Sequence, residues 1–316
     1  MKIRDIGLIA VVGFMLLSIG CGDGATPDTY LSRTVSFDRL REGKQVKAED
    51  LRRLYQRHGI PAKSIIENAD ETFYLARWTE GNFTLWRVTH TPGSPDVRYL
   101  IFRKKQNREE KYLADVMFNS PGRLPPNADF VPMQNGGLLG LRWEACRGPG
   151  VRFHRDFWYL IEQDRAEKVL DVPAKGHVEK WGTAFSRTLE SHVGVLFNDN
   201  RFAGIGYRYS AVYRPESEKL VDSTRPLRST LTQYWRWEQD KRDLVLDRGL
   251  SSATTGKVEA VFNNGADGFV EDNLDMLKRA ELTPNRKQWF KQIASTCDRK
   301  PTKLVMERLT RQKLSG

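Results

Sequence analysis

The sequence has few of the residues that build catalytic and metal centres. Its 316 residues include three cysteines and five histidines, and their spacing matches no zinc site. It contains no HExxH, GxSxG, P-loop or GxGxxG motif. The sequence therefore predicts neither a metal nor a cofactor, and it assigns no catalytic residue.

The chain also lacks an uncharged run long enough to cross a bilayer. The longest such run at the amino terminus, Ile6–Gly20, has 15 residues and follows Lys2 and Arg4. A membrane-spanning helix needs about 20 apolar residues. A short apolar run behind basic residues is instead typical of an export signal.

The end of this run carries a recognisable processing motif. The segment Leu17-Ser18-Ile19-Gly20-Cys21 resembles the bacterial lipobox, although Ser18 stands where an aliphatic residue is usual. The resemblance implies cleavage before Cys21 and lipidation of its thiol, hence a lipid-anchored protein of the bacterial cell envelope. Because Asp23 is one place beyond the position that favours inner-membrane retention, the resemblance favours the outer membrane, facing the periplasm, in a Gram-negative host. The alternative is an ordinary signal peptide or an uncleaved anchor in which Cys21 is incidental.

Composition divides the chain into a signal peptide (1–20), a polar lipidated tether (21–45) and a globular domain (46–316). Removal of the signal leaves a net charge of +10. A basic domain can attract anionic headgroups, acidic envelope polymers or an acidic protein, whereas export excludes nucleic acid. Acidic residues are interspersed nearly everywhere, so the charge is also explained by solubility alone.

The two cysteines that remain after lipidation raise the question of a disulfide. Cys146 and Cys297 would close a loop of about 150 residues in an oxidising compartment, worth roughly 4–5 kcal/mol in the chain-entropy model. Two buried, unpaired thiols are the alternative.

The pattern of the domain is mainly β, with many hairpins and short helices at both ends. A helix is expected over 47–58, stopped by Gly59 and Pro61. Further helices are expected over 271–280 and after Thr283, and the tail after Cys297 is open between strand, helix and mobile arm. Strands are predicted at 72–79, 83–90, 97–103, 112–118, 138–146, 151–163, 193–197, 202–207, 209–213, 230–238, 244–247 and 257–262.

One internal repetition accompanies these strands. Residues 161–171 and 237–247 are identical at six of eleven positions, and 212–222 are a weaker copy. Each copy is predicted to be a strand, a charged turn and a short strand. Repeated hairpins are typical of β-propellers or β-sandwiches, and the uneven intervals leave these two architectures unresolved.

Five residues are candidates for ligand contact. His154, Asp156 and Trp158 alternate along one predicted strand and so share a face, where a histidine beside a carboxylate could act as an acid and base. Trp235 and Trp237 share a face in the same way, and an aromatic strip can stack on sugar rings or anchor a protein. Ordinary core packing or a polar strand face explains the same residues without a ligand.

These observations favour a non-enzymatic binding module held to a membrane by lipid. Its expected partner is a protein of the envelope, or alternatively a glycan or an anionic surface; an inhibitor or immunity-type protein is one specific form. Two other hypotheses stay open: an envelope hydrolase with an unrecognised site, and a structural component of an envelope assembly.

Overall fold

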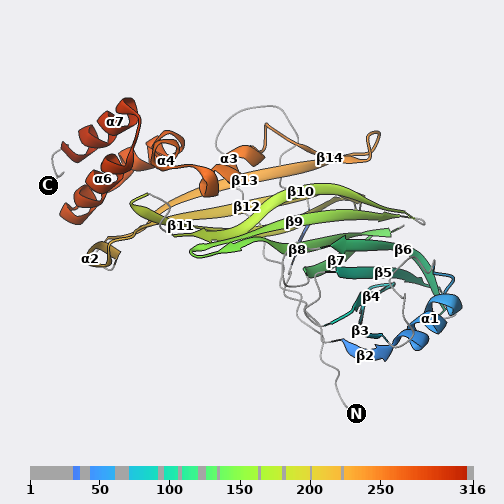
Figure 1. Cartoon of the computed structure of the whole chain (residues 1–316). Helices are drawn as coiled ribbons and strands as arrows, with labels where there is room; N and C mark the ends of the chain where they lie inside the picture. The colour runs from blue at the N-terminus through green and yellow to red at the C-terminus, as the bar shows by residue number, and fades with distance from the viewer. Residues whose placement is uncertain are drawn as a thin grey trace, which may run out of the picture.

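The structure of the chain is a computed structural model. It describes residues 31–35, 43–60, 71–91, 96–105, 109–119, 126–133, 136–162, 165–179, 183–199, 201–221 and 224–311, without the side chains of 31, 32, 146, 147 and 218. The predicted signal peptide and Cys21 lie outside these ranges. Within them the chain forms two open antiparallel sheets and several short helices (Figure 1), which confirms the prediction of a mainly β, antiparallel fold.

The smaller sheet has five strands in the order β2-β3-β4-β5-β6. They are β2 (Lys44–Lys47), β3 (Thr72–Glu80), β4 (Phe83–Thr89), β5 (Asp96–Lys104) and β6 (Glu110–Asn119). Helix α1 (Ala48–Arg57) covers one face of this sheet and buries Leu51 and Tyr55. The helix ends before Gly59, whose φ of 64° suits glycine. The helix expected over 47–58 is thereby confirmed.

The larger sheet has the order β14-β13-β12-β11-β10-β9-β8-β7, and β1 also pairs with β11. Its strands are β1 (Leu31–Thr34), β7 (Asn127–Pro132), β8 (Gly136–Gly148), β9 (Val151–Glu162), β10 (Arg165–Val178), β11 (Phe185–Asn198), β12 (Arg201–Pro215), β13 (Leu227–Glu238) and β14 (Asp243–Leu246). Helix α2 (Glu218–Val221) lies between β12 and β13.

The first described strand is built into the larger sheet. Strand β1 pairs with β11 from Leu31↔Phe197 to Thr34↔Gly194, whereas β10 pairs with β11 only from Gly176↔Leu189 to Val178↔Arg187. The range 21–45, expected as a tether, therefore includes a strand of the folded domain.

Helices cover one face of the larger sheet at the end away from α1 (Figure 1). They are α3 (Thr255–Asn263), α4 (Ala266–Asp272), α5 (Leu274–Arg279), α6 (Pro284–Thr296) and α7 (Lys300–Arg311). The Thr283 side chain caps α6 by accepting from the backbone N–H of Arg286, and Pro284 follows it, as expected. The helix expected over 271–280 corresponds to the end of α4 and to α5, and in the tail after Cys297 the segment Lys300–Arg311 is the helix α7.

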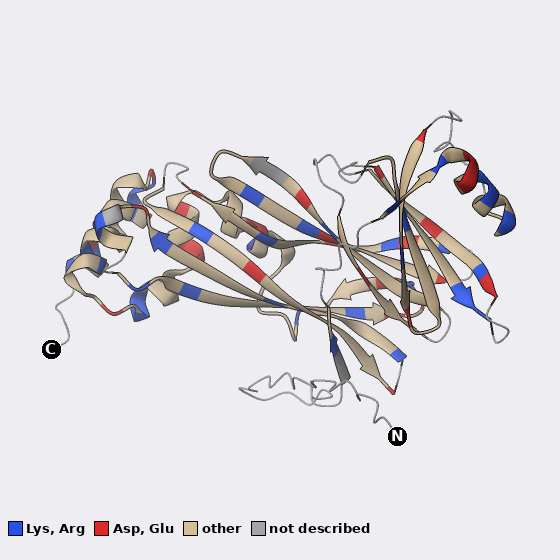
Figure 2. Cartoon of the chain, turned by 90° about the horizontal axis from the view of Figure 1, so that it is seen from below, with Lys and Arg blue, Asp and Glu red and all other residues tan. Residues whose placement is uncertain are grey.

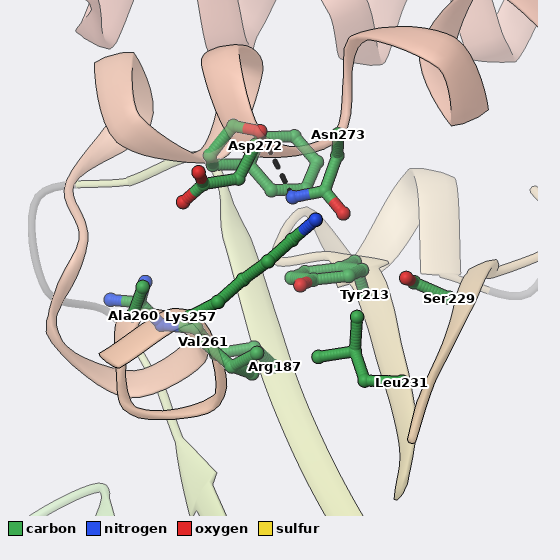
Figure 3. Close-up of a pocket in the computed structure, with 10 residues that line it drawn as sticks. Arg187, Tyr213, Ser229, Leu231, Lys257, Ala260, Val261, Asp272 and Asn273 are labelled. Atoms are coloured by element: carbon green, nitrogen blue, oxygen red, sulfur yellow. Dashed lines mark hydrogen bonds between the residues drawn. The ribbon is translucent and has the colours of Figure 1, made fainter. Parts of the chain in front are cut away.

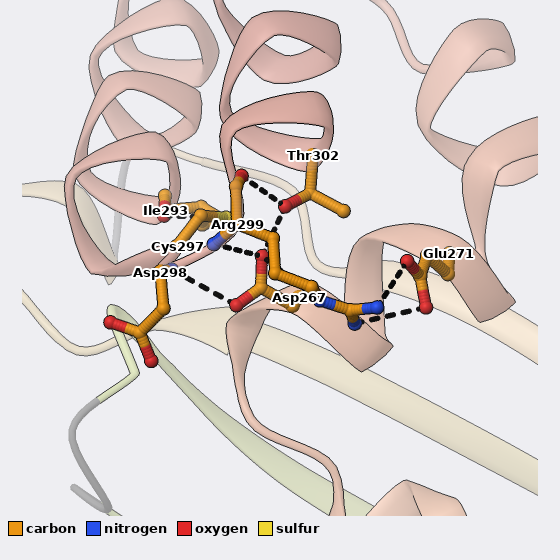
Figure 4. A network of polar contacts seen from close by, with 7 residues as sticks. All are labelled: Asp267, Glu271, Ile293, Cys297, Asp298, Arg299 and Thr302. Carbon is orange, nitrogen blue, oxygen red and sulfur yellow. Dashed lines mark hydrogen bonds and ion pairs between the residues drawn. The ribbon is translucent and has the colours of Figure 1, made fainter.

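A carboxylate on α4 joins it to the start of α7 (Figure 4). Asp267 accepts from the backbone N–H groups of Asp298 (2.9 Å) and Arg299 (3.1 Å) and from the hydroxyl of Thr302. Arg299 in turn pairs with Glu271 at 2.8 Å. Burial alone would raise the pKa of Asp267, but these hydrogen bonds outweigh it and the pKa is lowered. Asp267 thus acts as an N-terminal cap supplied by another helix.

The strand predicted at 257–262 is wrong, because this segment is helix α3. Val258, Val261 and Phe262 are buried at spacings of three and four, which is the period of one helix face. The side chain of Thr254 caps the helix by accepting from the backbone N–H of Lys257 at 3.3 Å. This cap and the helical spacing outweighed the β-branched content of the segment.

Two of the three repeated segments are hairpins, as predicted. The first joins β9 to β10 and the second joins β13 to β14. Their turns lie side by side, since Arg242 of the second forms an ion pair with Glu162 of the first. The third copy forms no hairpin, because α2 follows Pro215.

The two sheets share a core that sets the position of α1. Phe83, Leu85 and Tyr99 of the smaller sheet pack with Phe130 and Leu141 of the larger one. The smaller sheet therefore lies between α1 and the β7–β9 end of the larger sheet. Charged residues of both signs are spread over all these elements (Figure 2).

Candidate functional site

A wide groove opens where α1 ends against the smaller sheet. It has a volume of about 870 Å³ and is bordered by the end of α1 and by β3, β4 and the β5–β6 hairpin. Its lining residues define the α1 groove: Leu54, Arg57, His58, Gly59, Arg77, Trp86, Lys105, Glu109, Glu110, Lys111 and Tyr112. Ligand sites commonly enclose 300–1,000 Å³.

The α1 groove carries more positive than negative charge. Arg77 pairs with Glu110, and Lys105 with Glu109. Arg57 and Lys111 are exposed, and neither forms an ion pair with another described residue. These two cations leave the groove with an excess positive charge.

The carboxylate of Glu110 is held in place inside the groove. It accepts from the hydroxyl of Thr84 at 2.7 Å and from the guanidinium of Arg77. Burial acts to raise the pKa of Glu110, but these hydrogen bonds, with the charge of Arg77, lower it. Glu110 is therefore ionised at neutral pH and is occupied by its own neighbours.

An indole forms part of the groove wall. Trp86 is 4% exposed, and its Nε1–H has no hydrogen-bond acceptor within the described structure. The rings of His58 and Phe102 pack on it, with centroids 5.3 and 4.4 Å away. A buried donor without an acceptor is costly, and this N–H is covered by protein atoms, so it does not face the open groove.

A polar network beneath the groove fixes its wall. The buried Arg98 donates through Nε to Asp115 at 2.7 Å, and the hydroxyl of Tyr112 donates to the same carboxylate at 2.5 Å. The guanidinium of Arg98 also lies over the ring of Tyr55, 5.2 Å from its centroid. This network connects α1 to β5 and β6, so the groove is bordered by rigid elements.

The three candidates on β9 lie elsewhere, in the larger sheet. Asp156 is fully buried and accepts from Arg142 at 2.7 and 2.8 Å and from the hydroxyl of Tyr207 at 3.1 Å. Trp158 is equally buried and donates to the same hydroxyl at 2.7 Å. The partners of Asp156 are therefore structural groups, and His154 is not among the residues that bind its carboxylate.

His154 is half-buried and is held in its neutral form. Burial lowers its pKa to about 4, and the charge of Lys175, opposite it on β10, adds to this effect. An acid–base histidine, the role that the sequence suggested for His154, would have a pKa near neutrality. His154 does not match that role.

The two candidate tryptophans on β13 are half-buried against the core of the larger sheet. The Nε1–H of Trp237 donates to Gln239 at 2.9 Å, and its ring lies 5.6 Å from that of Phe202. Trp235 packs on the same core. Most of their ring surface is thus used in packing, and neither lines the α1 groove.

The carboxyl-terminal cysteine of the possible disulfide has a free thiol in this structure. Cys297 is buried at the end of α6, and its Sγ lies 3.4 Å from the carbonyl oxygen of Ile293. Burial raises the pKa of this thiol. The side chain of Cys146 lies outside the described part of the structure.

The sequence contains the groove residues but not a signal of their assembly. Arg57 lies on the solvent face of the predicted helix, and Lys104–Lys111 is a charged hairpin turn. Neither pattern differs from an ordinary solvated surface. Only the packing of α1 across the sheet brings them together.

Comparisons with known proteins assign no family. No family model and no curated protein matches the chain. One similar solved structure, that of a GDP-Man-dependent mannosyltransferase from Leishmania mexicana, has 10% identity and a TM-score of 0.24, over 61% of this chain and 74% of that one. Among the described residues there is no cluster of three or more potential metal ligands and no helix able to cross a membrane.

Proposed function

We propose that this protein is a lipid-anchored binding module of the bacterial envelope. In this proposal the α1 groove receives an acidic segment of a protein partner, and Cys21 holds the domain to the membrane. The observation that carries the proposal is the groove itself, which is wide, rigidly bordered and positive.

The unpaired charges favour an acidic partner. Arg57 and Lys111 are exposed on the groove, where carboxylates of a partner can pair with them. Each exposed ion pair stabilises a complex by roughly 0.2–1 kcal/mol. Such contacts add specificity and raise the association rate more than they add affinity.

The wall of the groove supplies the other half of an interface. Tyr112 is a half-buried aromatic residue of the lining, and the edge of the 4% exposed Trp86 adds to it. Aromatic anchors surrounded by a polar rim are the usual organisation of protein interfaces.

The chemistry of the lining favours binding over hydrolysis. The described lining residues include no serine, threonine or cysteine nucleophile. The Glu110 carboxylate is already bound by Thr84 and Arg77, so it is not a free base.

The proposal can be tested with a charged peptide and the full chain in detergent. The probe is a fluorescein-labelled peptide of ten glutamates, followed by anisotropy, with the corresponding lysine peptide as its control. Because two cations become anions, Arg57→Glu with Lys111→Glu should weaken glutamate-peptide binding at least about tenfold.

The matched control reverses two exposed charges outside the groove, Arg228→Glu with Lys303→Glu. This control has the same net charge as the test variant. It should bind the glutamate peptide as the unaltered protein does if the groove is the site, and as weakly as the test variant if only the net charge matters. Equal binding by the two variants, or no binding by the unaltered protein, would overturn the proposal.

A further inference from the structure

A second, much smaller cavity lies between the larger sheet and the carboxyl-terminal helices (Figure 3). Its volume is about 40 Å³, room for roughly three water-sized probes. Arg187 of β11 and Tyr213 of β12 line it from the sheet side, and Lys257 of α3 from the helix side. A cavity of this size excludes a sugar, a peptide or an acyl chain.

Arg187 is the unusual residue of this cavity. It is 3% exposed, and it donates through Nη1 to the backbone carbonyl of Asn264. Its Nε has no acceptor within the described structure, and no described carboxylate is hydrogen-bonded to the guanidinium. The carboxylate of Glu216 acts on Arg187 only as a nearby charge, and burial outweighs it and lowers the pKa of the guanidinium. A buried cation without a hydrogen-bonded anion is unfavourable.

A second cation reaches the same space. The Lys257 side chain extends along the cavity toward Tyr213 (Figure 3), and Lys257 forms no ion pair with any other described residue. The one acidic lining residue, Asp272, accepts from the side-chain amide of Asn264 at 2.6 Å. In Figure 3 its carboxylate is turned away from the Lys257 ammonium.

The remaining polar groups of the cavity can donate hydrogen bonds. Tyr213 is buried, which raises the pKa of its hydroxyl to about 12, so the hydroxyl keeps its proton at neutral pH. Ser229 adds a hydroxyl, whereas the side-chain amide of Asn273 already donates to the carbonyl oxygen of Phe269 at 3.0 Å. Two cations with several neutral donors match the needs of an oxyanion.

From this arrangement we propose that the cavity is a binding site for one small oxyanion of phosphate size, held between Arg187 and Lys257. The anion supplies a directly hydrogen-bonded counter-charge, which Arg187 lacks among the described residues. Because its ligands come from β11, β12 and α3, the bound ion also fastens the helices to the sheet.

Inorganic phosphate is the probe that tests this site, with the full chain in detergent and ionic strength held constant with potassium chloride. Calorimetric titration should give one site per chain, and phosphate should raise the Tm. Hydrogen exchange of α3 and α4 should slow on binding. Acetate, a planar monoanion, should bind more weakly than phosphate.

Lys257→Gln is the informative variant, because Lys257 is exposed and its loss leaves the core intact. We expect its Kd for phosphate to rise at least tenfold. The matched control Lys303→Gln, an exposed lysine of α7, should bind as the unaltered protein does. Arg187→Gln should abolish binding, and the lysine variant decides the outcome if the arginine variant fails to fold.

Two results would overturn the inference. One is the absence of saturable phosphate binding by the unaltered protein at phosphate concentrations up to about 10 mM. The other is an unchanged Kd in Lys257→Gln, which would place the bound ion elsewhere.

Discussion

Replacing Asp156 with alanine removes a fully buried carboxylate that accepts three hydrogen bonds. The change leaves the guanidinium of Arg142, whose side chain is only 11% exposed, without its counter-charge. The hydroxyl of Tyr207 loses an acceptor as well. Removing one partner of a buried ion pair costs about 3–5 kcal/mol, so we expect a loss of about 4 kcal/mol in the free energy of unfolding.

A second aspartate provides the matched control. Asp171 pairs with Arg155 at the same 2.7 Å, but its side chain is 34% exposed. This pair is partly exposed, and Arg155 keeps Glu259 as a second partner at 2.8 Å, so its contribution should be close to the roughly 0–1 kcal/mol of surface pairs. Asp171→Ala should therefore cost less than about 1 kcal/mol, although the two ion pairs have the same length.

Urea unfolding followed by tryptophan fluorescence measures both variants, provided that the m-value stays unchanged. At roughly 2–4 °C per kcal/mol for a chain of this size class, the Tm should fall by about 8–16 °C for Asp156→Ala. Replacing Arg142 with Met and Asp156 with Leu together should recover part of the loss, since no charge is then left buried. Equal costs for the two single variants would refute the assignment of Asp156 to a buried structural network.

Three further predictions concern other parts of the fold. Asp267→Ala leaves two backbone N–H groups at the start of α7 without their acceptor and should lower the free energy of unfolding, measured with urea, by about 1–2 kcal/mol. Asp275→Ala, at an exposed position, should change it by less than about 0.5 kcal/mol, and equal losses would contradict the cap. The folded pKa of His154 is about 4, below its unfolded value, so between about pH 6.5 and 4 the unfolded chain binds the extra proton. The free energy of unfolding should therefore fall by on the order of 1–2 kcal/mol as pH drops through that window. The fall should be smaller in His154→Gln, and identical pH profiles of the two proteins would refute this. Gly136→Ala would place its Cβ 1.8 Å from a carbonyl oxygen of β9, whereas Gly206→Ala meets nothing nearer than 3.6 Å, so only the first should lower the Tm markedly, and equal Tm values would contradict this packing.

The strands were predictable because their signals are local. Alternating aromatic and β-branched residues bounded by turn residues identify β3 to β6, and the repeated segments identify two hairpins. The part of β10 beyond Asp171 was not predicted, because it contains Pro173 and Gly176, both usual strand breakers. In the structure Pro173 adjoins a register shift, and Gly176 leaves room for the ring of Phe262.

The candidate sites were less predictable because they depend on contacts between distant segments. Alternation placed His154 and Asp156 on one face, but the partners of Asp156 are 14 and 51 residues away. Strand register and the curvature of the sheet decide such pairings, and a single sequence does not specify either. The α1 groove depends in the same way on how a helix lies across a sheet.

The central claim is that the α1 groove binds an acidic partner in the envelope, and photo-crosslinking in intact cells tests it most directly. A benzophenone amino acid at Lys105, a groove residue, is compared with one at Lys303, an exposed lysine outside the groove. If the groove binds an acidic partner, we expect one discrete membrane-associated adduct from Lys105, none of the same mass from Lys303, and loss of the adduct when Arg57 and Lys111 become glutamate. No adduct at Lys105, or one that survives both charge reversals, would contradict it.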